Sequence, residues 1–146
     1  MTATEQNRQL VEHMFSELAN GNPAAFAAAL ADDVRWHTPG HSIWSRTFHG
    51  KRAVLDDLLG PVRAQLVERV RLAVLRIIAD GDHVVVEAKG SATTKTGKPY
   101  NNEYCFVFRV ADGKVAAITE YLDTELAAQA LVAPWASTTT AASPGA

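Results

Sequence analysis

One carboxylate in the second half of the chain has neighbours suited to proton transfer. The segment KVAAITEYL, residues 114–122, has the composition of a strand, in which successive side chains point to opposite faces. Glu120 then shares an inward face with Ile118 and Leu122. A carboxylate buried among apolar groups has a raised pKa, which suits proton exchange near neutral pH. Glu120 is therefore the first candidate for a catalytic acid or base. The alternatives are a structural carboxylate and a register that turns it toward solvent.

The preceding strand carries hydrogen-bonding side chains on an aromatic face. By the same alternation, that face holds Tyr100, Asn102, Tyr104, Phe106 and Phe108. Tyr104 is a candidate donor to a developing oxyanion, and Asn102 is a candidate to hydrogen-bond Glu120 or a substrate oxygen. Phe106 and Ile118 are expected to line the same pocket. The alternatives are a core tyrosine whose hydroxyl finds any partner and an asparagine that serves a turn.

A third group of candidates lies between residues 34 and 50. Trp36, Trp44 and Phe48 are expected to form the apolar walls of a ligand site, with Trp44 at its mouth, although these residues also suit an ordinary core. His37 is a candidate second acid or base beside Glu120, because imidazole titrates near neutrality. Otherwise His37 is a solvent-exposed strand end.

The first half of the chain is predicted to be mainly helical. Apolar residues at helical spacing predict one helix over about residues 4–20 and a shorter one that starts at Pro23 and ends at Asp32–Asp33. A short strand, Val34–Thr38, leads into an irregular loop. A third helix is then predicted over Lys51–Leu59, closed by Gly60–Pro61.

The second half is predicted to be strands. Between about residues 67 and 123, β-branched and aromatic residues are punctuated by three hairpin signals, which predicts four antiparallel strands. Arg69 and Arg71 are expected on an exposed edge or a subunit interface. A short helix, Thr124–Val132, is expected to follow Asp123 as its cap. Helices that cover the concave face of a bent sheet give an α+β domain with an internal pocket.

The composition predicts one globular domain, residues 1–132, and a disordered tail, residues 133–146, that lacks apolar residues to pack apart from Trp135. A formal net charge of −2 gives no support for binding to nucleic acid or a membrane surface. Because no apolar run approaches the ~18 residues of a membrane span and the first residues lack the pattern of a signal peptide, a cytoplasmic location is expected.

No motif in the sequence indicates a cofactor. The single cysteine, Cys105, excludes an internal disulfide, and it is expected to pack on the face opposite Tyr104. The histidines at 37, 41 and 49 are not expected to bind a metal, because Pro39–Gly40 prevents a helical pair and no acidic ligand lies between them. The expected partner is a hydrophobic small molecule or a protein, and no cofactor is expected.

The order of these elements, together with VRWHTPG, WSRTFHGKRAV, NNEYCFVFRVADGKV and EYLDT, resembles the SnoaL-like branch of the nuclear-transport-factor-2-like superfamily, which includes ketosteroid-isomerase-like proteins. The resemblance covers about residues 5–132. It implies a cone-shaped, cystatin-like fold with three N-terminal helices packed on a strongly curved antiparallel sheet. It also implies a homodimer formed sheet to sheet, with Glu87, Lys89 and Arg109 as candidates for its polar contacts.

The resemblance also bears on the reaction. The acidic position that polyketide cyclases use as general acid or base matches Glu120, whereas the position of the steroid isomerase base is Thr38 here. The Arg and Asp of limonene-type epoxide hydrolases have no match in EAKG, residues 87–90. The expected function is cofactor-independent proton transfer on a hydrophobic oxygenated small molecule, in isomerisation, aldol-type cyclisation or epoxide opening. The alternative is a non-catalytic binding or dimerisation module, because one fold hosts many functions.

Overall fold

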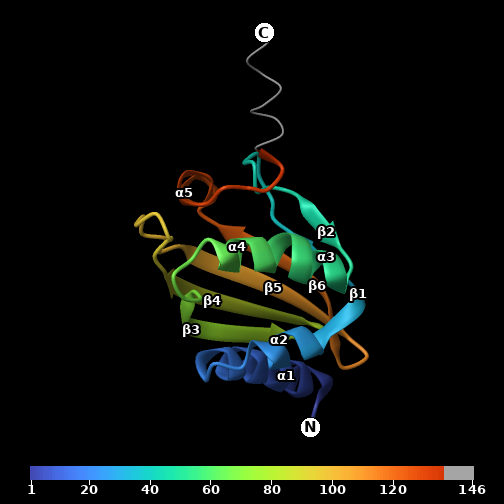
Figure 1. The fold of residues 1–146 in the computed structure, drawn as a ribbon. Helices are drawn as coiled ribbons and strands as arrows, with labels where there is room; N and C mark the ends of the chain where they lie inside the picture. The colour runs from blue at the N-terminus through green and yellow to red at the C-terminus, as the bar shows by residue number, and fades with distance from the viewer. Residues whose placement is uncertain (137–146) are drawn as a thin grey trace.

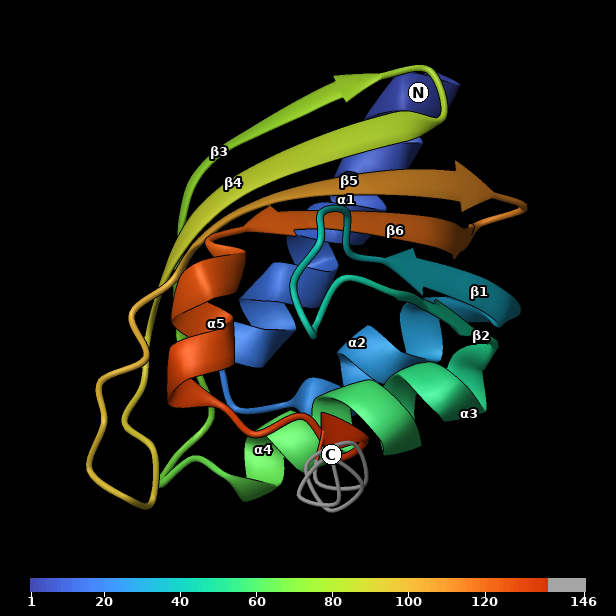
Figure 2. The same cartoon turned by 90° about the horizontal axis from the view of Figure 1, so that it is seen from above.

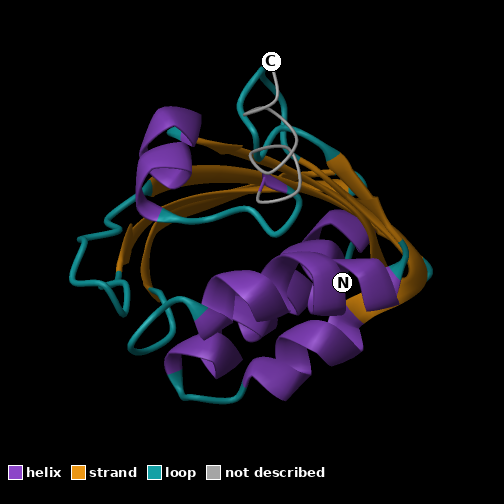
Figure 3. Cartoon of the chain, turned by 45° about the horizontal axis from the view of Figure 1, so that its top comes forward, coloured by secondary structure: helices purple, strands orange, loops and turns teal. Residues whose placement is uncertain are grey.

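The computed structural model describes residues 1–136 and has the α+β architecture predicted from the sequence. A six-stranded, strongly curved sheet wraps around helices that cover its concave face (Figures 1 and 3). The predicted fold class is thus confirmed. The strands lie in the order β2-β1-β6-β5-β4-β3 across the sheet.

Two N-terminal helices begin at signals that are visible in the sequence, a capping box for the first and a proline for the second. Helix α1 spans Ala3–Ala19 and begins with a capping box, in which Thr2 Oγ1 accepts from the Glu5 amide at 3.1 Å and the Glu5 carboxylate accepts from the Thr2 amide at 3.3 Å. Helix α2 spans Pro23–Ala29 and buries Phe26. Both helices cover the concave side of the sheet (Figure 3).

Four long strands form the predicted antiparallel meander. They are β3 (Arg71–Asp80), β4 (His83–Ser91), β5 (Glu103–Ala111) and β6 (Lys114–Leu122). The tight turns depend on glycine, since Gly81 and Gly113 have φ angles of +60° and +72°. Figure 2 shows these strands arching over the helices.

Strand β1 is longer than predicted. It spans Leu30–His37, so helix α2 ends at Ala29 and not at Asp32–Asp33. Leu30 is already extended, with φ −78° and ψ 136°, and it is buried in the core, which favours the strand over another helical turn. The acidic pair lies at an irregularity between Leu30 and Arg35 in the pairing with β6.

Strand β1 also joins the sheet at a place that the sequence does not reveal. It runs parallel to β6, with Trp36 opposite Ile118, and antiparallel to the short strand β2, Thr47–His49. Strand β2 has only three residues, too few for a strand pattern in the sequence. The parallel pairing brings the end of β1 beside Glu120.

The third helix continues through the proline that was expected to end it. Helix α3 (Lys51–Ala53), a π-helical stretch η1 (Val54–Leu59) and helix α4 (Gly60–Ala64) follow without a break. The Gly60 amide donates to the Leu55 carbonyl, five residues earlier. Since the Pro61 ring cannot donate and crowds the preceding turn, this wider turn accommodates it, and the prediction of a helix end at Gly60–Pro61 is wrong.

The chain then closes the fold with a short helix. Helix α5 spans Thr124–Ala130, and Asp123 Oδ1 caps it by accepting from the Leu126 amide at 3.0 Å. Beyond it, Ala133 is buried and the indole of Trp135 donates to the Ile43 carbonyl at 3.0 Å. The predicted start of a disordered tail at residue 133 is corrected by this packing. Residues 137–146 lie outside the described residues.

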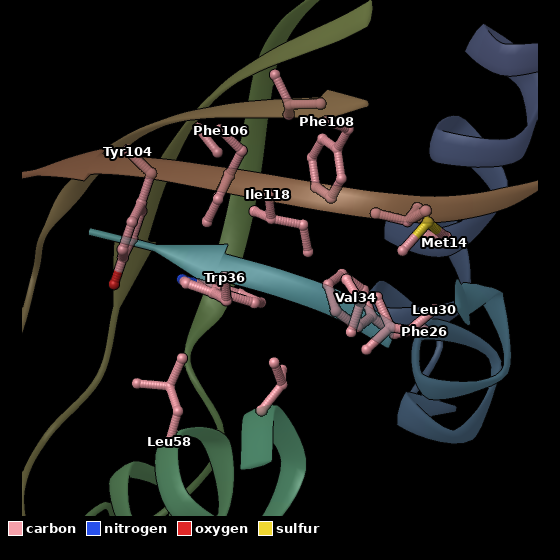
Figure 4. Close-up of a cluster of buried hydrophobic side chains, with 14 of the residues drawn as sticks. Met14, Phe26, Leu30, Val34, Trp36, Leu58, Tyr104, Phe106, Phe108 and Ile118 are labelled. Carbon is pink, nitrogen blue, oxygen red and sulfur yellow. The ribbon is translucent and has the colours of Figure 1, made fainter. Parts of the chain in front are cut away.

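The core lies between the concave face of the sheet and the helices. Its centre is aromatic, because Phe15 packs against Phe26, Phe106 and Phe108 with ring centroids 5.8 to 6.2 Å apart. Figure 4 shows Trp36 on β1 with the side chains of Phe106, Phe108 and Ile118 on one side and Leu58 on the other. At one end of this core the packing gives way to a cavity.

Candidate functional site

A cavity of about 670 Å³ lies between the concave sheet face and the helices. Its walls are mostly apolar, with Phe26, Leu55, Leu58 and Leu59 from the helices and Phe106 from β5. Volumes of this order are typical of sites for small molecules. Three charged residues lie on its walls, Arg63, Arg69 and Glu120.

Glu120 lies on the wall of this cavity, as the strand alternation predicts. Its Oε1 accepts a hydrogen bond from Trp36 Nε1 at 3.2 Å and another from Thr38 Oγ1 at 3.3 Å. Both donors come from the end of β1, which the parallel pairing places beside β6. No cation pairs with Glu120 within residues 1–136, and no hydrogen bond of this part of the chain involves Oε2.

The environment of Glu120 changes its acidity. Burial among apolar groups raises its pKa from 4.5 to about 7, although the hydrogen bonds from Trp36 and Thr38 lower the pKa in part. The side chain is half-buried, since it borders the open cavity. Near neutral pH, both the acid and the carboxylate are therefore present in comparable amounts.

Tyr104 also lines the cavity, with a hydroxyl that stays protonated. Burial is the main cause that raises its pKa, and its hydroxyl interacts with that of Tyr100, another residue of the cavity wall. Tyr104 faces Leu122 across the strand pair, whereas Glu120 faces Phe106. The donors to Glu120 are Trp36 and Thr38, and neither Tyr104 nor Asn102 makes a hydrogen bond with it. Tyr104 remains a donor within the same cavity.

Gly90 on β4 makes room for the Tyr104 ring. A Cβ atom at this position would lie 2.9 Å from Tyr104 Cε2 and 2.8 Å from Val70 Cγ1. Both distances are shorter than real side chains tolerate. The glycine therefore allows Tyr104 to lie flat against β4, and Tyr104 stacks on Phe106 with ring centroids 5.2 Å apart.

Two of the three predicted wall residues from the first half line the cavity. Trp36 and Trp44 are both buried and belong to its wall. Phe48 does not: it is buried, and its ring lies 5.9 Å from that of Trp135. This placement corrects the assignment of Phe48, because it shares the face of Trp36, its partner across β1 and β2, but lies on the edge strand and packs against Trp135.

His37 points away from the site. It follows the inward Trp36 in β1, so its side chain lies on the opposite face, where it is exposed and Nδ1 lies 2.8 Å from Thr47 Oγ1. A role for His37 as a second acid or base beside Glu120 is contradicted by this placement. The group next to Glu120 is the following residue, Thr38.

Asn102 and Ile118 are fully buried but lie outside the cavity wall. Asn102 holds the end of β6: its Oδ1 accepts from the Asp123 amide and its Nδ2 donates to the Asp123 carbonyl, both at 3.0 Å. Its remaining donor capacity goes to Tyr100 Oη at 3.4 Å. Ile118 packs in the core beside Trp36, its partner in the pairing of β1 and β6. Both are corrected from substrate-binding to structural residues.

Several wall residues escape prediction from the sequence. Thr38 looks like the end of a strand before a proline, and its hydroxyl can be assigned only once β1 and β6 are known to pair. Arg69 is expected on an exposed strand, whereas it lies before the start of β3 on the cavity wall. Tyr100 could have been found, since it shares the strand face of Tyr104.

Two further features of residues 1–136 bear on the kind of site. Within this range, no three His, Cys, Asp or Glu side chains gather closely enough to hold a metal ion. None of the helices in the same range is both long and apolar enough to cross a membrane.

Comparisons with known proteins agree with the fold. The family model of a SnoaL-like domain matches residues 11–118. Among solved structures, a nuclear-transport-factor-2-like protein of unknown function from Burkholderia pseudomallei is 24% identical, with a TM-score of 0.75 over 91% of this chain and 100% of the other. Another nuclear-transport-factor-2-like protein, from Burkholderia xenovorans, is 26% identical, with a TM-score of 0.69 over 90% of this chain and 100% of the other.

A proposed SnoaL-like polyketide cyclase from a Jannaschia species is 17% identical, with a TM-score of 0.75 over 92% of this chain and 96% of the other. At this identity the likeness shows the fold alone. No curated protein matches the sequence.

Proposed function

This chain belongs to the family of SnoaL-like domains, and we propose that it is an enzyme in which Glu120 transfers a proton on a hydrophobic oxygenated small molecule. The reaction is an isomerisation, an aldol-type cyclisation or an epoxide opening that needs no cofactor. Its substrate occupies the cavity between the sheet and the helices.

One observation carries this proposal: Glu120 is an acid on the wall of an apolar cavity, and no cation of residues 1–136 pairs with it. General acids and bases work best when their pKa lies near the working pH, and that of Glu120 is about 7. Trp36 and Thr38 fix the carboxyl group through Oε1 and leave Oε2 to exchange a proton with a ligand. Held in this way, Glu120 can remove a proton from carbon and return it elsewhere.

Tyr104 supplies the complementary group. Removal of a proton next to a carbonyl leaves negative charge on the carbonyl oxygen, and a neutral hydroxyl on the wall of a mostly apolar cavity stabilises that charge well. The Tyr104 hydroxyl stays protonated and interacts with that of Tyr100, so one phenol proton is shared between them and the other is free to donate to a ligand. The same donor would serve the alkoxide of an opening epoxide.

The alternative is a binding module that holds a small molecule without reacting. It requires the same cavity, but it gives no reason for an unpaired acid on the cavity wall, since an amide would bind a ligand equally well with a smaller desolvation penalty. An exposed or ion-paired Glu120 would have favoured this alternative.

The test is turnover of a mixed panel of epoxides, β,γ-enones and polyketide-like β-keto esters, followed by mass spectrometry. Glu120→Gln is expected to lose about 10²- to 10⁴-fold in rate, the usual contribution of a general acid or base. The control is Glu103→Gln, since the Glu103 side chain on the outer face is 75% exposed. Equal turnover by wild type and Glu120→Gln would reject the assignment of Glu120. Binding of panel members without turnover would favour the binding module.

We also propose that the chain forms a homodimer through the outer face of its sheet. Ile78 and Tyr121 on this face are 54% and 51% exposed, and exposed apolar residues on a sheet favour a covering partner. Glu87 and Lys89 already pair within the chain, with Arg76 and Glu103. Light scattering at micromolar concentration should give about twice 15.7 kDa, and a species of 15.7 kDa alone would contradict the dimer.

A further inference from the structure

Another charged residue of the cavity wall, Arg69, has no hydrogen-bond or ion-pair partner among residues 1–136. Arg69 belongs to the segment between α4 and β3, and its guanidinium extends to the turn between α1 and α2, where Nη2 would lie 3.7 Å from a Cβ placed on Gly21. Leu18, Gly21 and Pro23 at this turn form the adjoining part of the wall. Glu120 lies elsewhere on the wall, on β6.

The Arg69 guanidinium makes no hydrogen bond and no ion pair with any of residues 1–136. Its Nη1 is enclosed by protein atoms and has no acceptor. A guanidinium carries its charge at all physiological pH values, so enclosing Nη1 with its N–H donors unsatisfied is unfavourable. The other arginine of the wall, Arg63, differs, because its Nη1 donates to the Leu66 carbonyl at 3.1 Å.

A purely structural role for Arg69 would be to neutralise the C-terminal end of α1, whose carbonyl groups carry partial negative charge. However, these carbonyls already accept hydrogen bonds from backbone amides. The carbonyls of Ser16, Glu17 and Leu18 accept from the amides of Asn20, Asn22 and Gly21 at 2.8 to 3.1 Å. The Glu17 carboxylate accepts from Asn22 Nδ2 at 2.9 Å. The end of α1 is therefore satisfied without Arg69.

We propose that Arg69 binds a negatively charged oxygen group of the ligand, a carboxylate or a group of similar charge and shape. Guanidinium groups suit such anions because their planar fork matches two oxygens at once. The ligand is then an amphipathic acid, with an apolar body in the cavity and its anionic group on Arg69. Placing its reactive carbon at Glu120 rests on the function proposed above; the anion site itself does not.

Trp44 supports this assignment from another part of the wall. It is buried, and its indole Nε1 has no hydrogen-bond partner within residues 1–136. A second unsatisfied donor on the same wall fits a ligand that brings oxygen acceptors. Together, Trp44 and Arg69 offer donors where the protein itself provides no acceptor.

A matched pair of fluorescent probes tests the proposal. Anilinonaphthalene sulfonate and phenylnaphthylamine share one aromatic body, but only the first carries an anionic group. Wild type is expected to bind the sulfonate more tightly than the neutral probe. Arg69→Met is expected to weaken binding of the sulfonate at least about tenfold and that of the neutral probe less than about twofold, because a charge-assisted contact is lost from one probe only.

Two further variants complete the design. Arg69→Lys keeps the charge without the fork, so it should recover part of the affinity for the sulfonate. Arg71→Met is the control for net charge, since the Arg71 side chain is 83% exposed. This variant should bind both probes with the affinity of wild type. The melting temperature of Arg69→Met should equal or exceed that of wild type, because an enclosed donor without an acceptor is removed.

Several results would overturn the anion site. One is that wild type binds the sulfonate no more tightly than the neutral probe. Another is that Arg69→Met binds both probes equally more weakly and has a lower melting temperature, which would indicate a structural role for Arg69. None of these readouts involves proton transfer. Failure of the Glu120→Gln turnover experiment would therefore leave the anion site standing, and the reverse also holds.

Discussion

Charged side chains on the outer face of the sheet differ in their ion pairing from those in the cavity on its inner side. On the outer face, Glu87 Oε1 lies 3.3 Å from Arg76 Nε, and Glu103 Oε1 lies 3.6 Å from Lys89 Nζ. In the cavity, Glu120 has only neutral hydrogen-bond donors, and no acid within residues 1–136 pairs with Arg69.

This difference indicates where charged side chains lower the stability of the free protein. Exposed pairs cost little to form and contribute little, since water screens them. Unpaired charges beside an apolar cavity destabilise the free protein, and they are useful only if a ligand meets them. Charges on the outer face are paired, as on a solvated surface. Charges in the cavity are not, as in a site that binds a charged or polar ligand. The predictions below test this contrast.

The largest difference in stability is expected between neighbouring residues of β5. Phe108 is fully buried on the inner face, so Phe108→Ala should lower the free energy of unfolding by about 3–5 kcal/mol. Val107 is half-buried on the outer face, and Val107→Ala should cost about 1 kcal/mol. Urea unfolding measures both. Similar values for the two variants would show that the outer face is as well covered as the core.

The second effect is a dependence of stability on pH that comes from Glu120. Because its pKa rises from 4.5 to about 7 on folding, the folded protein binds this proton more tightly than the unfolded chain does. The stability that this proton supplies is complete below pH 4.5 and is lost as the pH rises through about 7. At about 1.4 kcal/mol per pKa unit, the loss is on the order of 3 kcal/mol.

Glu120→Gln removes this titration. The difference in unfolding free energy between the variant and wild type should therefore change by on the order of 3 kcal/mol between pH 4.5 and 8, in favour of the variant at high pH. Unfolding in urea across this range gives the difference directly. A constant difference would mean that Glu120 ionises equally in the folded and unfolded states.

Removal of one donor to Glu120 should raise its pKa further. Thr38→Val keeps the shape of the side chain but loses the hydrogen bond to Oε1, which lowers the pKa of Glu120. A hydrogen bond of this kind contributes about 1 kcal/mol, so the pKa should rise by up to about one unit. The pH profile of turnover, or of stability, reports the shift. A fall in the pKa would contradict the role given to Thr38.

The smallest effect is expected from the outer ion pairs. Glu87→Gln should change the free energy of unfolding by less than about 1 kcal/mol, because the Arg76 side chain that it faces is 62% exposed. A double-mutant cycle with Arg76→Met isolates the coupling between the two side chains. A coupling of several kcal/mol would show that the outer ion pairs contribute substantially to stability, which would contradict the difference proposed between the two sides of the sheet.

Most of the fold could be predicted from local patterns in the sequence. Helix α1 and the strands β3 to β6 follow from caps, alternation and glycine turns, which depend on neighbours in the chain. The errors arise where tertiary contacts decide. Strand β2 exists because β1 pairs with it, and Pro61 is kept in a helix by a π-helical turn whose leucines border the cavity.

The residues of the candidate site also fall into two groups, those that strand alternation predicts and those that only tertiary contacts place. Glu120, Tyr104, Trp36 and Phe106 were accessible to prediction, since strand alternation fixes the face of each side chain. His37 lies on the face opposite Trp36, as alternation along β1 requires, and it is the solvent-exposed strand end that the sequence offered as the alternative to a second acid or base. Thr38 and Arg69 reach the cavity only through long-range pairing and packing, and no pattern within their own segments indicates this.

The central claim is that Glu120 is an acid with a pKa near neutrality. Its most direct test is a titration of the Glu120 side-chain carboxyl carbon by NMR, with the resonance assigned by its loss in Glu120→Gln. The account predicts a midpoint at about pH 7. A midpoint near that of an exposed glutamate, about 4.3, would show that Glu120 is an ordinary carboxylate at neutral pH and would contradict the proposed function.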